Sequence, residues 1–428
     1  MVRALFAHSY AWIIIGAVGG LEVVALVSRR APWLGEWVWT IDWMGGMIPL
    51  VAAAAAGVAA VAARAFTSRA RADLLATTPH RGRALLGPVV TCIAVAVAAH
   101  LVGVGVAVAL TAVANPTGGV PVLPVLEQVT AIVAAGLTGA LLGARVRSPV
   151  SPVVAAGGTV MVALYADNLG WYPLLDTGGA TGSLIGLHYN YPSVAVRIGL
   201  LVLTSLTLVG LLVAGGRRLS PLRVASILGL SGVITYMLFV GGTDETRFVV
   251  DNAPMEYKCA AIRETEVCVH IAHQRFLDDV AEPISHAVAT LKDLGVHVDR
   301  RWEERLLGHE PVESTGYFRI PLEAFEGADV DDLRLVSDVV QPRPCFTAEP
   351  PSVEQDSVMM ILVAEAATRA NLVREGEWIG DVDLLTAFGA AEPEDQEAWL
   401  KERYGNVQQC NVQELTLPQW VPEDAIWR

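Results

Sequence analysis

Lysine is almost missing from this chain of 428 residues, and its scarcity argues against a nucleotide-binding P-loop, which needs a lysine. The three lysines are Lys258, Lys292 and Lys401, and none of them follows the glycine pattern of a nucleotide-binding P-loop. The chain also lacks the His-Glu-x-x-His pattern of zinc peptidases, and His270 with His273 is its closest approach to metal-ligand spacing. We therefore expect no nucleotide hydrolysis, no catalytic residue, no cofactor and no metal on this chain.

Cysteine is scarce as well, with five in the chain. Cys92 lies in an apolar run, whereas Cys259, Cys268, Cys345 and Cys410 lie in the acidic second half. Four cysteines in one domain suggest two disulfides if that domain faces an oxidising compartment. We expect the pairs Cys259–Cys268, which would close a hairpin, and Cys345–Cys410. This pairing is one of three connectivities, and free thiols are the alternative.

Charged residues make up only 17% of the chain, and they are unevenly distributed. Residues 1–242 carry 14 arginines and 7 acidic residues, whereas residues 243–428 carry 16 basic and 37 acidic residues. The net charges are therefore +7 and −21. The acidic half lacks the basic footprint that nucleic acids need. We predict two domains, 1–242 and 243–428, and no nucleic-acid partner.

Long apolar runs fill the first domain, and 53% of all residues are hydrophobic, more than soluble chains usually have. Each run is close to the roughly 20 residues that cross a hydrocarbon core of about 30 Å. No small-residue cleavage site follows the first run, so we expect it to remain as a signal anchor. The tryptophan-rich stretch 33–43 is expected to lie flat on the outer interface. The seven expected spans are 10–28, 44–65, 87–113, 122–144, 149–167, 193–216 and 224–242.

Arginine placement predicts the orientation. Ten of the 14 arginines before residue 243 lie in the loops 64–83, 145–147 and 217–223. Cationic loops resist translocation, and these three are separated by two spans each, so all should face the cytoplasm. We therefore expect a protein of the bacterial plasma membrane, in contact with the lipid bilayer. Its N-terminus would be cytoplasmic and its acidic domain extracytoplasmic.

The loop from Arg64 to Gly87 reads RAFTSRARADLLATTPHRGRALLG and contains one acid, Asp73. Residues 68–76 suit a short helix, which Pro79 would end. The loop thus has, in order, a basic turn, Asp-Leu-Leu, a proline, an arginine and an apolar span. This order resembles the first cytoplasmic loop of permease subunits of type-2 ABC exporters. The resemblance implies a short helix that docks on a separate ATPase subunit, and an ordinary basic loop is the alternative. The implied docking residues are Arg71, Asp73, Leu74, Leu75, Pro79, Arg81 and Arg83.

The segment 168–191 is too polar and glycine-rich to cross a membrane, yet too aromatic for an ordinary loop. We interpret it as partly re-entrant or interfacial, marked by Trp171, Tyr172 and Tyr189. In the exporters named above, the matching position holds short re-entrant helices that close the outer end of the pathway. A surface loop anchored by its aromatic residues is the alternative.

Three polar residues stand out within the expected spans: Glu22, His100 and Glu127. Such groups are unfavourable at membrane depth and usually face a bundle interior or a polar path. They could line a substrate path or a protomer interface, or they could pair with neighbouring polar side chains to support packing. Arg197 lies nearer the outer end and is expected to reach the interface.

The second domain alternates between strand-like and helix-like segments without regular βαβ spacing, so we expect an α+β fold. Amphipathic periodicity predicts its helices, and β-branched runs predict its strands. The expected strands are 246–251, 267–271, 296–298 and 317–320, and the expected helices are 274–295, 356–374 and 392–404.

Taken together, these features predict a polytopic α-helical membrane protein with a type-2 ABC exporter-like core and an extracytoplasmic α+β domain. The resemblance implies a dimeric permease, paired with a second copy or a homologue, that moves an amphipathic, lipid-like or peptide-like substrate. ATP and Mg would then bind the partner ATPase. The seventh span departs from the usual six. The alternatives are a membrane-anchored extracytoplasmic binding or sensory protein and a polytopic membrane enzyme such as a peptidase.

Overall fold

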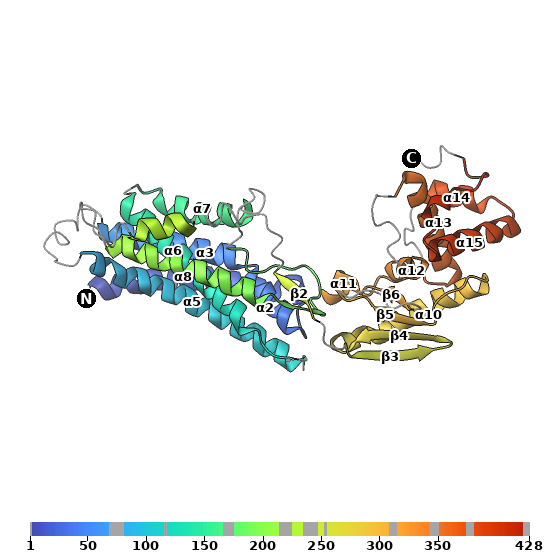
Figure 1. Cartoon of the computed structure of the whole chain (residues 1–428), viewed down its shortest axis with the longest axis horizontal. Coiled ribbons are helices and arrows are strands. Elements are labelled where there is room, and N and C mark those ends of the chain that lie inside the picture. Colours follow the sequence, from blue (N-terminus) through green and yellow to red (C-terminus); the bar gives the residue numbers. More distant parts are fainter. Residues whose placement is uncertain are drawn as a thin grey trace. The chain divides into compact units, whose positions relative to one another are not determined.

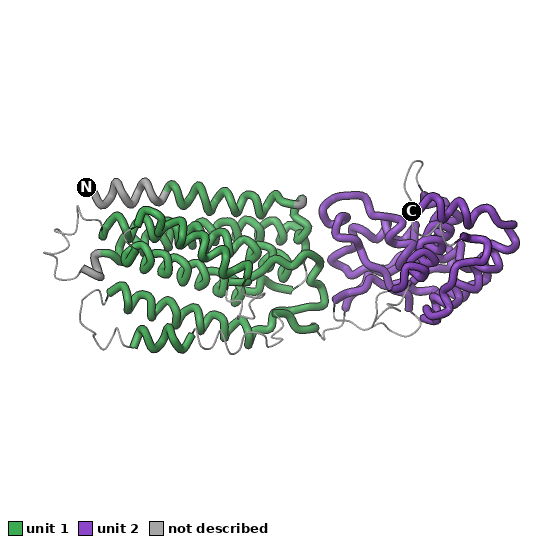
Figure 2. Tube along the Cα trace, turned by 90° about the horizontal axis from the view of Figure 1, so that it is seen from above, with its two compact units in different colours: residues 1–251 green, residues 252–428 purple. Residues whose placement is uncertain are grey.

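The chain forms two compact units in a computed structural model, residues 1–251 (unit 1) and 252–428 (unit 2) (Figure 2). The structure describes residues 2–67, 81–114, 116, 118–146, 148–165, 175–213, 225–233, 247–251, 255–307, 315–341, 351–373 and 381–422.

Unit 1 is a bundle of long apolar helices that lie side by side (Figure 1). Its polypeptide is predominantly alanine, valine, leucine and glycine, which gives helices that are apolar around most of their circumference. Residues 225–233 are also helical. The other helices are α1 (Val2–Val27), α2 (Trp37–Gly45), α3 (Ile48–Thr67), α5 (Arg81–Val113), α6 (Val122–Arg145), α7 (Ser151–Tyr165) and α8 (Tyr191–Val213).

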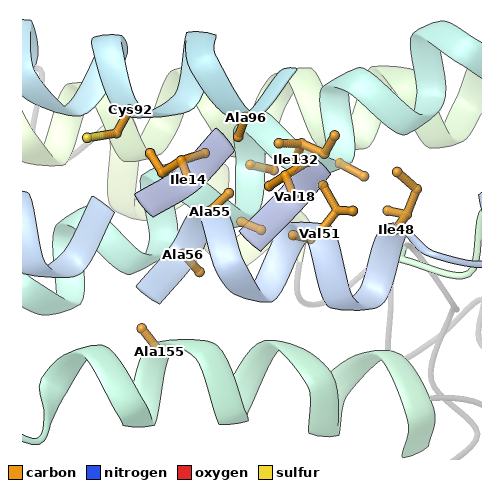
Figure 3. Close-up of a cluster of buried hydrophobic side chains, with 14 of the residues drawn as sticks. Ile14, Val18, Ile48, Val51, Ala55, Ala56, Cys92, Ala96, Ile132 and Ala155 are labelled. Carbon is orange, nitrogen blue, oxygen red and sulfur yellow. The ribbon is translucent and has the colours of Figure 1, made fainter. Parts of the chain in front are cut away.

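Helices α3 and α6 form the tightest contact in the bundle because α6 presents glycines to α3. A methyl group at Gly139 would collide with the backbone of Ala56, and one at Gly143 with the backbone of Ala60. The two helices therefore run in the same direction with their backbones almost touching, as small residues permit in membrane bundles. Around this contact, side chains from α1, α3, α5 and α6 form a buried apolar cluster (Figure 3).

Within the part of the chain that the structure describes, four stretches of helix are long and apolar enough to cross a membrane. They are Trp37–Thr67, Leu85–Val113, Val122–Arg145 and Tyr191–Val213. Two further apolar stretches, Trp12–Val27 and Ser151–Tyr165, are shorter. The seventh predicted span, 224–242, is described only over 225–233. Unit 1 is thus compatible with membrane insertion, but the predicted count of seven spans is not confirmed.

The two units differ in how many large apolar side chains they expose. Among the described residues, unit 2 exposes the large apolar side chains Leu307, Val353 and Val382 and no others. Unit 1 exposes such side chains on most of its helices, including Trp12 at 61% and Val102 at 67%. Water solvates such a surface poorly, whereas lipid tails solvate it well. This contrast supports a membrane environment for unit 1.

The tryptophan-rich stretch 33–43 packs into unit 1. Most of it belongs to α2, and the side chains of Trp33 and Trp39 are fully buried. The indole nitrogen of Trp39 donates to the carbonyl of Ala180 at 3.1 Å. A tryptophan that finds a backbone acceptor can bury its whole ring, and this favours the interior over the surface here.

A small antiparallel sheet completes unit 1. Strand β1 (Leu187–Tyr189) pairs with β2 (Phe248–Val250), so that Tyr189 lies opposite Phe248. The bonds continue beyond the strands, because Asn190 donates to the carbonyl of Arg247 at 2.9 Å. The segment before α8 is thereby joined to the last residues of unit 1.

Unit 2 contains a four-stranded sheet in the order β3-β4-β5-β6. Strands β3 and β4 are antiparallel, whereas β4, β5 and β6 are parallel. Helix α10 connects β4 to β5, so the unit includes a β-α-β crossover that the sequence analysis did not anticipate. The elements are β3 (Tyr257–Ile262), β4 (Thr265–His270), α10 (Leu277–Asp293), β5 (Arg301–Glu304), β6 (Gly316–Phe318), α11 (Leu322–Phe325), α12 (Asp332–Val340), α13 (Val353–Arg369), α14 (Val382–Gly389) and α15 (Pro393–Gln408).

The strand predicted at 296–298 is wrong. Val296 and Val298 are buried and His297 between them is exposed, so the alternation itself is present. The ladder begins only at Arg301, which pairs with Glu266. Alternating burial marks an extended chain against a core, but it does not specify which residues find a strand partner.

The disulfide between Cys259 and Cys268 is confirmed. The two cysteines lie directly opposite each other in the β3–β4 hairpin. Cys410 is also disulfide-bonded, and its predicted partner, Cys345, lies outside the described residues. Among the described cysteines, Cys92 alone is a free thiol, and it is buried.

Candidate functional site

The three polar residues predicted within the spans are buried in unit 1. Glu22 on α1 is 3% exposed, Glu127 on α6 is 1% exposed, and His100 on α5 is fully buried. The structure places them in two networks. Glu22 contacts His100, whereas Glu127 faces Arg197 on α8. Each polar group therefore has a partner, as burial in an apolar bundle requires.

The first network is a chain of contacts centred on His100, which we call the His100 triad (Glu22, His100 and Gln128). The Nδ1 atom of His100 lies 2.6 Å from Oε1 of Glu22, and its Nε2 atom lies 3.1 Å from Oε1 of Gln128. The amide nitrogen of Gln128 donates to the carbonyl of Ile41 at 2.9 Å. Four helices, α1, α5, α6 and α2, are thus linked through one imidazole ring.

Local sequence on α5 makes room for the glutamate. Gly103 lies three residues after His100, so the two share a face of the helix. A Cβ atom at Gly103 would come within 2.6 Å of the Oε2 atom of Glu22. This glycine therefore allows the carboxylate to approach α5 closely enough to contact His100.

The second network is an acid–arginine cluster (Asp42, Glu127, Asp176, Arg197 and Arg247). The guanidinium of Arg197 lies 3.6 Å from the carboxylate of Glu127 and donates to the carbonyl of Asp176 at 2.8 Å. Arg197 is only 5% exposed, so it does not extend to the interface as expected.

Asp42 on α2 is the other acidic centre of this cluster. One of its carboxylate oxygens lies 3.2 Å from the guanidinium of Arg247. The other accepts hydrogen bonds from the backbone N–H groups of Gly179 and Ala180, at 2.8 and 2.7 Å. Arg247 also lies 3.6 Å from the exposed carboxylate of Asp176. Burial alone would lower the pKa of Arg247, but Asp42 and the other acids nearby raise it above its usual value.

Residues 175–190, which we call the cap segment, pack against α2 without forming a helix. Besides the two bonds to Asp42, the backbone N–H of Leu184 donates to the carboxylate of Glu36 at 2.9 Å. Tyr189 at its end is 1% exposed, and burial raises the pKa of its phenol well above the usual value. Two carboxylates thus accept hydrogen bonds from backbone N–H groups of this non-helical segment.

Several predicted residues cannot be placed. Trp171 and Tyr172 lie outside the described residues, as does the segment 68–80, with Arg71, Asp73, Leu74, Leu75 and Pro79. Arg81 and Arg83 belong to the first turn of α5, and the contacts of their side chains are not described.

The sequence analysis missed most partners in these networks. Gln128, Glu36, Asp42 and Arg247 were not singled out. One signal was available for Gln128, because it follows Glu127 in an otherwise apolar helix. Arg247 offered no such signal, since it lies about 200 residues from Asp42 along the chain.

Unit 2 contains a separate buried polar group. The Nδ1 atom of His273 lies 2.6 Å from Glu304, whose other oxygen accepts from the backbone N–H of His270 at 3.0 Å. These contacts link the ends of β4 and β5. Cys259, Glu266 and Cys268 have the spacing of metal ligands, but the two sulfurs are bonded to each other.

Comparisons with models of known protein families, with curated proteins and with solved structures found no match for this chain.

Proposed function

We propose that this chain is the permease subunit of an ATP-driven exporter of the type-2 ABC class. It would act as a dimer with a separate ATPase subunit, which binds ATP and Mg. One observation carries the proposal. The arginines Arg64, at the end of α3, and Arg81 and Arg83, at the start of α5, belong to the opposite end of the helical bundle from the cap segment.

The two ends follow from contacts between parallel helices. Near their starts, α6 and α8 meet through Glu127 and Arg197. Near their ends, Arg145 of α6 donates to the carbonyl of Leu211 of α8 at 3.1 Å. Arg64 occupies the last turn of α3, which runs in the same direction as α6. Arg64 and Arg145 thus lie at one end of the bundle, and the cap segment, held by Asp42 and Glu36, lies at the other.

This arrangement suits the conversion of a push at one end into access at the other. Closure of the ATPase pair would press on the residues around Asp73 to Leu75, between α3 and α5. Because Gly139 and Gly143 hold α6 tightly against α3, these two helices should move together. α2 directly precedes α3, so the same movement would pull on the carboxylates that hold the cap segment. Its release would open an outward path.

Unit 1 also supports an apolar or amphipathic substrate. Helix α7 exposes Val153, Val154 and Met161, and few of its residues are buried. A substrate that partitions into lipid could reach such a face directly from the bilayer. No covalent step is assigned to this chain.

Co-purification of the full chain with an ATP-hydrolysing subunit tests the proposal. Leu74→Glu places a charge in the docking segment and should abolish recovery of the ATPase from native membranes. Val122→Glu is a matched control, because Val122 is 73% exposed at the start of α6, at the opposite end, where a helix tolerates an acid. It should leave recovery unchanged. Recovery of no ATPase with the wild-type chain would overturn the proposal and favour a membrane-anchored binding or sensory protein.

A further inference from the structure

The hydrogen bonds of the His100 triad determine where its protons are. The side-chain amide of Gln128 has one donor atom and one acceptor atom. Its nitrogen must face the carbonyl of Ile41, because an oxygen there would oppose a second acceptor. Its oxygen therefore faces Nε2 of His100, and that nitrogen must carry a hydrogen.

The other nitrogen of the ring requires a second proton. An ionised carboxylate only accepts hydrogen bonds, and a bare Nδ1 atom does the same. Yet Nδ1 of His100 lies 2.6 Å from the carboxyl oxygen of Glu22. A proton must therefore lie between them, either on the ring, as an imidazolium against a carboxylate, or on Glu22, as a carboxylic acid against a neutral ring. Both forms have no net charge.

Loss of this proton would be strongly unfavourable at this position. A lone pair would then face a carboxylate, and a net negative charge would remain where Glu22 and His100 are almost completely buried. The second oxygen of Glu22 has no hydrogen-bond partner among the described residues, so nothing there would stabilise the charge.

The other charged groups on the neighbouring helices are engaged elsewhere. On α6, Glu127 faces Arg197 of α8, and on α2, Asp42 faces Arg247. Gln128, the third member of the triad, is neutral. The proton shared by Glu22 and His100 is therefore balanced within the triad itself.

We propose that Glu22 and His100 form a proton-binding site, with Gln128 as a positioning residue. One proton per chain, taken from water, holds α1 against α5, and its release loosens this contact. The site makes the bundle responsive to pH whether or not an ATPase binds the chain. Its failure would leave the proposed transport function untouched.

Nitrogen-15 NMR of the full chain in lipid nanodiscs, with labelled histidine, tests the site directly. At about pH 7 one imidazolium signal of the wild type should disappear in Glu22→Gln. If the proton lies on Glu22 instead, one protonated-carboxyl band in the infrared spectrum should disappear in the same variant. Glu22→Gln should fold, since its amide can donate to Nδ1 of a neutral ring. A neutral His100 together with an ionised Glu22 would overturn the proposal.

Thermal unfolding between about pH 6 and about pH 9 provides a second readout. As the pH rises, the unfolded chain releases a proton that the folded chain keeps. Over that pH range the folding equilibrium constant of the wild type should fall by up to tenfold per pH unit. Glu22→Gln should reduce this dependence by the contribution of one proton per chain. An unchanged slope in Glu22→Gln would contradict the proposal.

Discussion

Replacing Asp42 by Asn tests whether the acid–arginine cluster holds the cap segment in place. Asn keeps one acceptor oxygen for the backbone N–H groups of Gly179 and Ala180, but it removes the charge opposite Arg247. Asp42 is 1% exposed and its carboxylate lies 3.2 Å from that guanidinium. Breaking a buried pair by removing one partner typically costs about 3–5 kcal/mol, because the other charge remains buried.

Asp176→Asn is the matched control, because Asp176 faces the same guanidinium at 3.6 Å while its side chain is 54% exposed. Solvent screens such a pair, so its loss should cost only about 0–1 kcal/mol. The loss of unfolding free energy in the double variant Asp42→Asn/Arg247→Gln should be smaller than the sum of the losses in Asp42→Asn and Arg247→Gln. The difference should be about 0.5–3 kcal/mol.

The assay is reversible unfolding of the full chain in mixed micelles, with the free energy of unfolding measured for the four variants. Tryptophan fluorescence is a suitable signal, since Trp39 contacts the cap segment at Ala180. Equal losses for Asp42→Asn and Asp176→Asn would refute the reasoning, and so would a double-mutant cycle with no coupling.

Three further predictions concern packing, the disulfide and a half-buried acid. Gly139→Leu should disrupt the α3–α6 contact and destabilise the chain by about 1–3 kcal/mol through overpacking, which should lower its melting temperature. Gly157→Leu should leave the melting temperature unchanged, because a Cβ atom at Gly157 meets no neighbouring atom within 4 Å. Cys259→Ser with Cys268→Ser should destabilise unit 2 by about 2–4 kcal/mol in denaturant titrations, and an unchanged midpoint would argue against the bridge. Burial raises the pKa of Asp338, so its charged form opposes folding above that pKa. Asp338→Asn should therefore stabilise unit 2 at about pH 7, with the gain disappearing at acidic pH, and a variant less stable than wild type at neutral pH would contradict this.

The positions of the long helices were predictable from the sequence because each is an uninterrupted apolar run. The expected span 122–144 corresponds closely to α6, and 87–113 falls within α5. Hydropathy reports the length of such a run, and length is what distinguishes a span from a loop. It says little about a helix that is short or aromatic, which is why α2 was missed.

The partners within the site were not predictable in the same way. Glu22, His100 and Glu127 stood out because polar residues are rare in apolar runs. Whether Glu22 meets His100 or Glu127 depends on how each helix is rotated about its axis, and a bundle that is apolar all round gives no periodicity from which to infer this. Asp42 and Arg247 lie outside the predicted spans, so only the folded chain reveals that they belong to the same cluster.

The most direct test of the account is the rate of ATP hydrolysis by the co-purified complex in lipid nanodiscs. We expect the wild-type complex to hydrolyse ATP and the Val122→Glu complex to do so at a similar rate. The Leu74→Glu preparation should lose this activity together with its ATPase subunit. Wild-type preparations without ATP hydrolysis, or Leu74→Glu preparations that keep it in full, would contradict the claim that a partner drives this chain through the segment between α3 and α5.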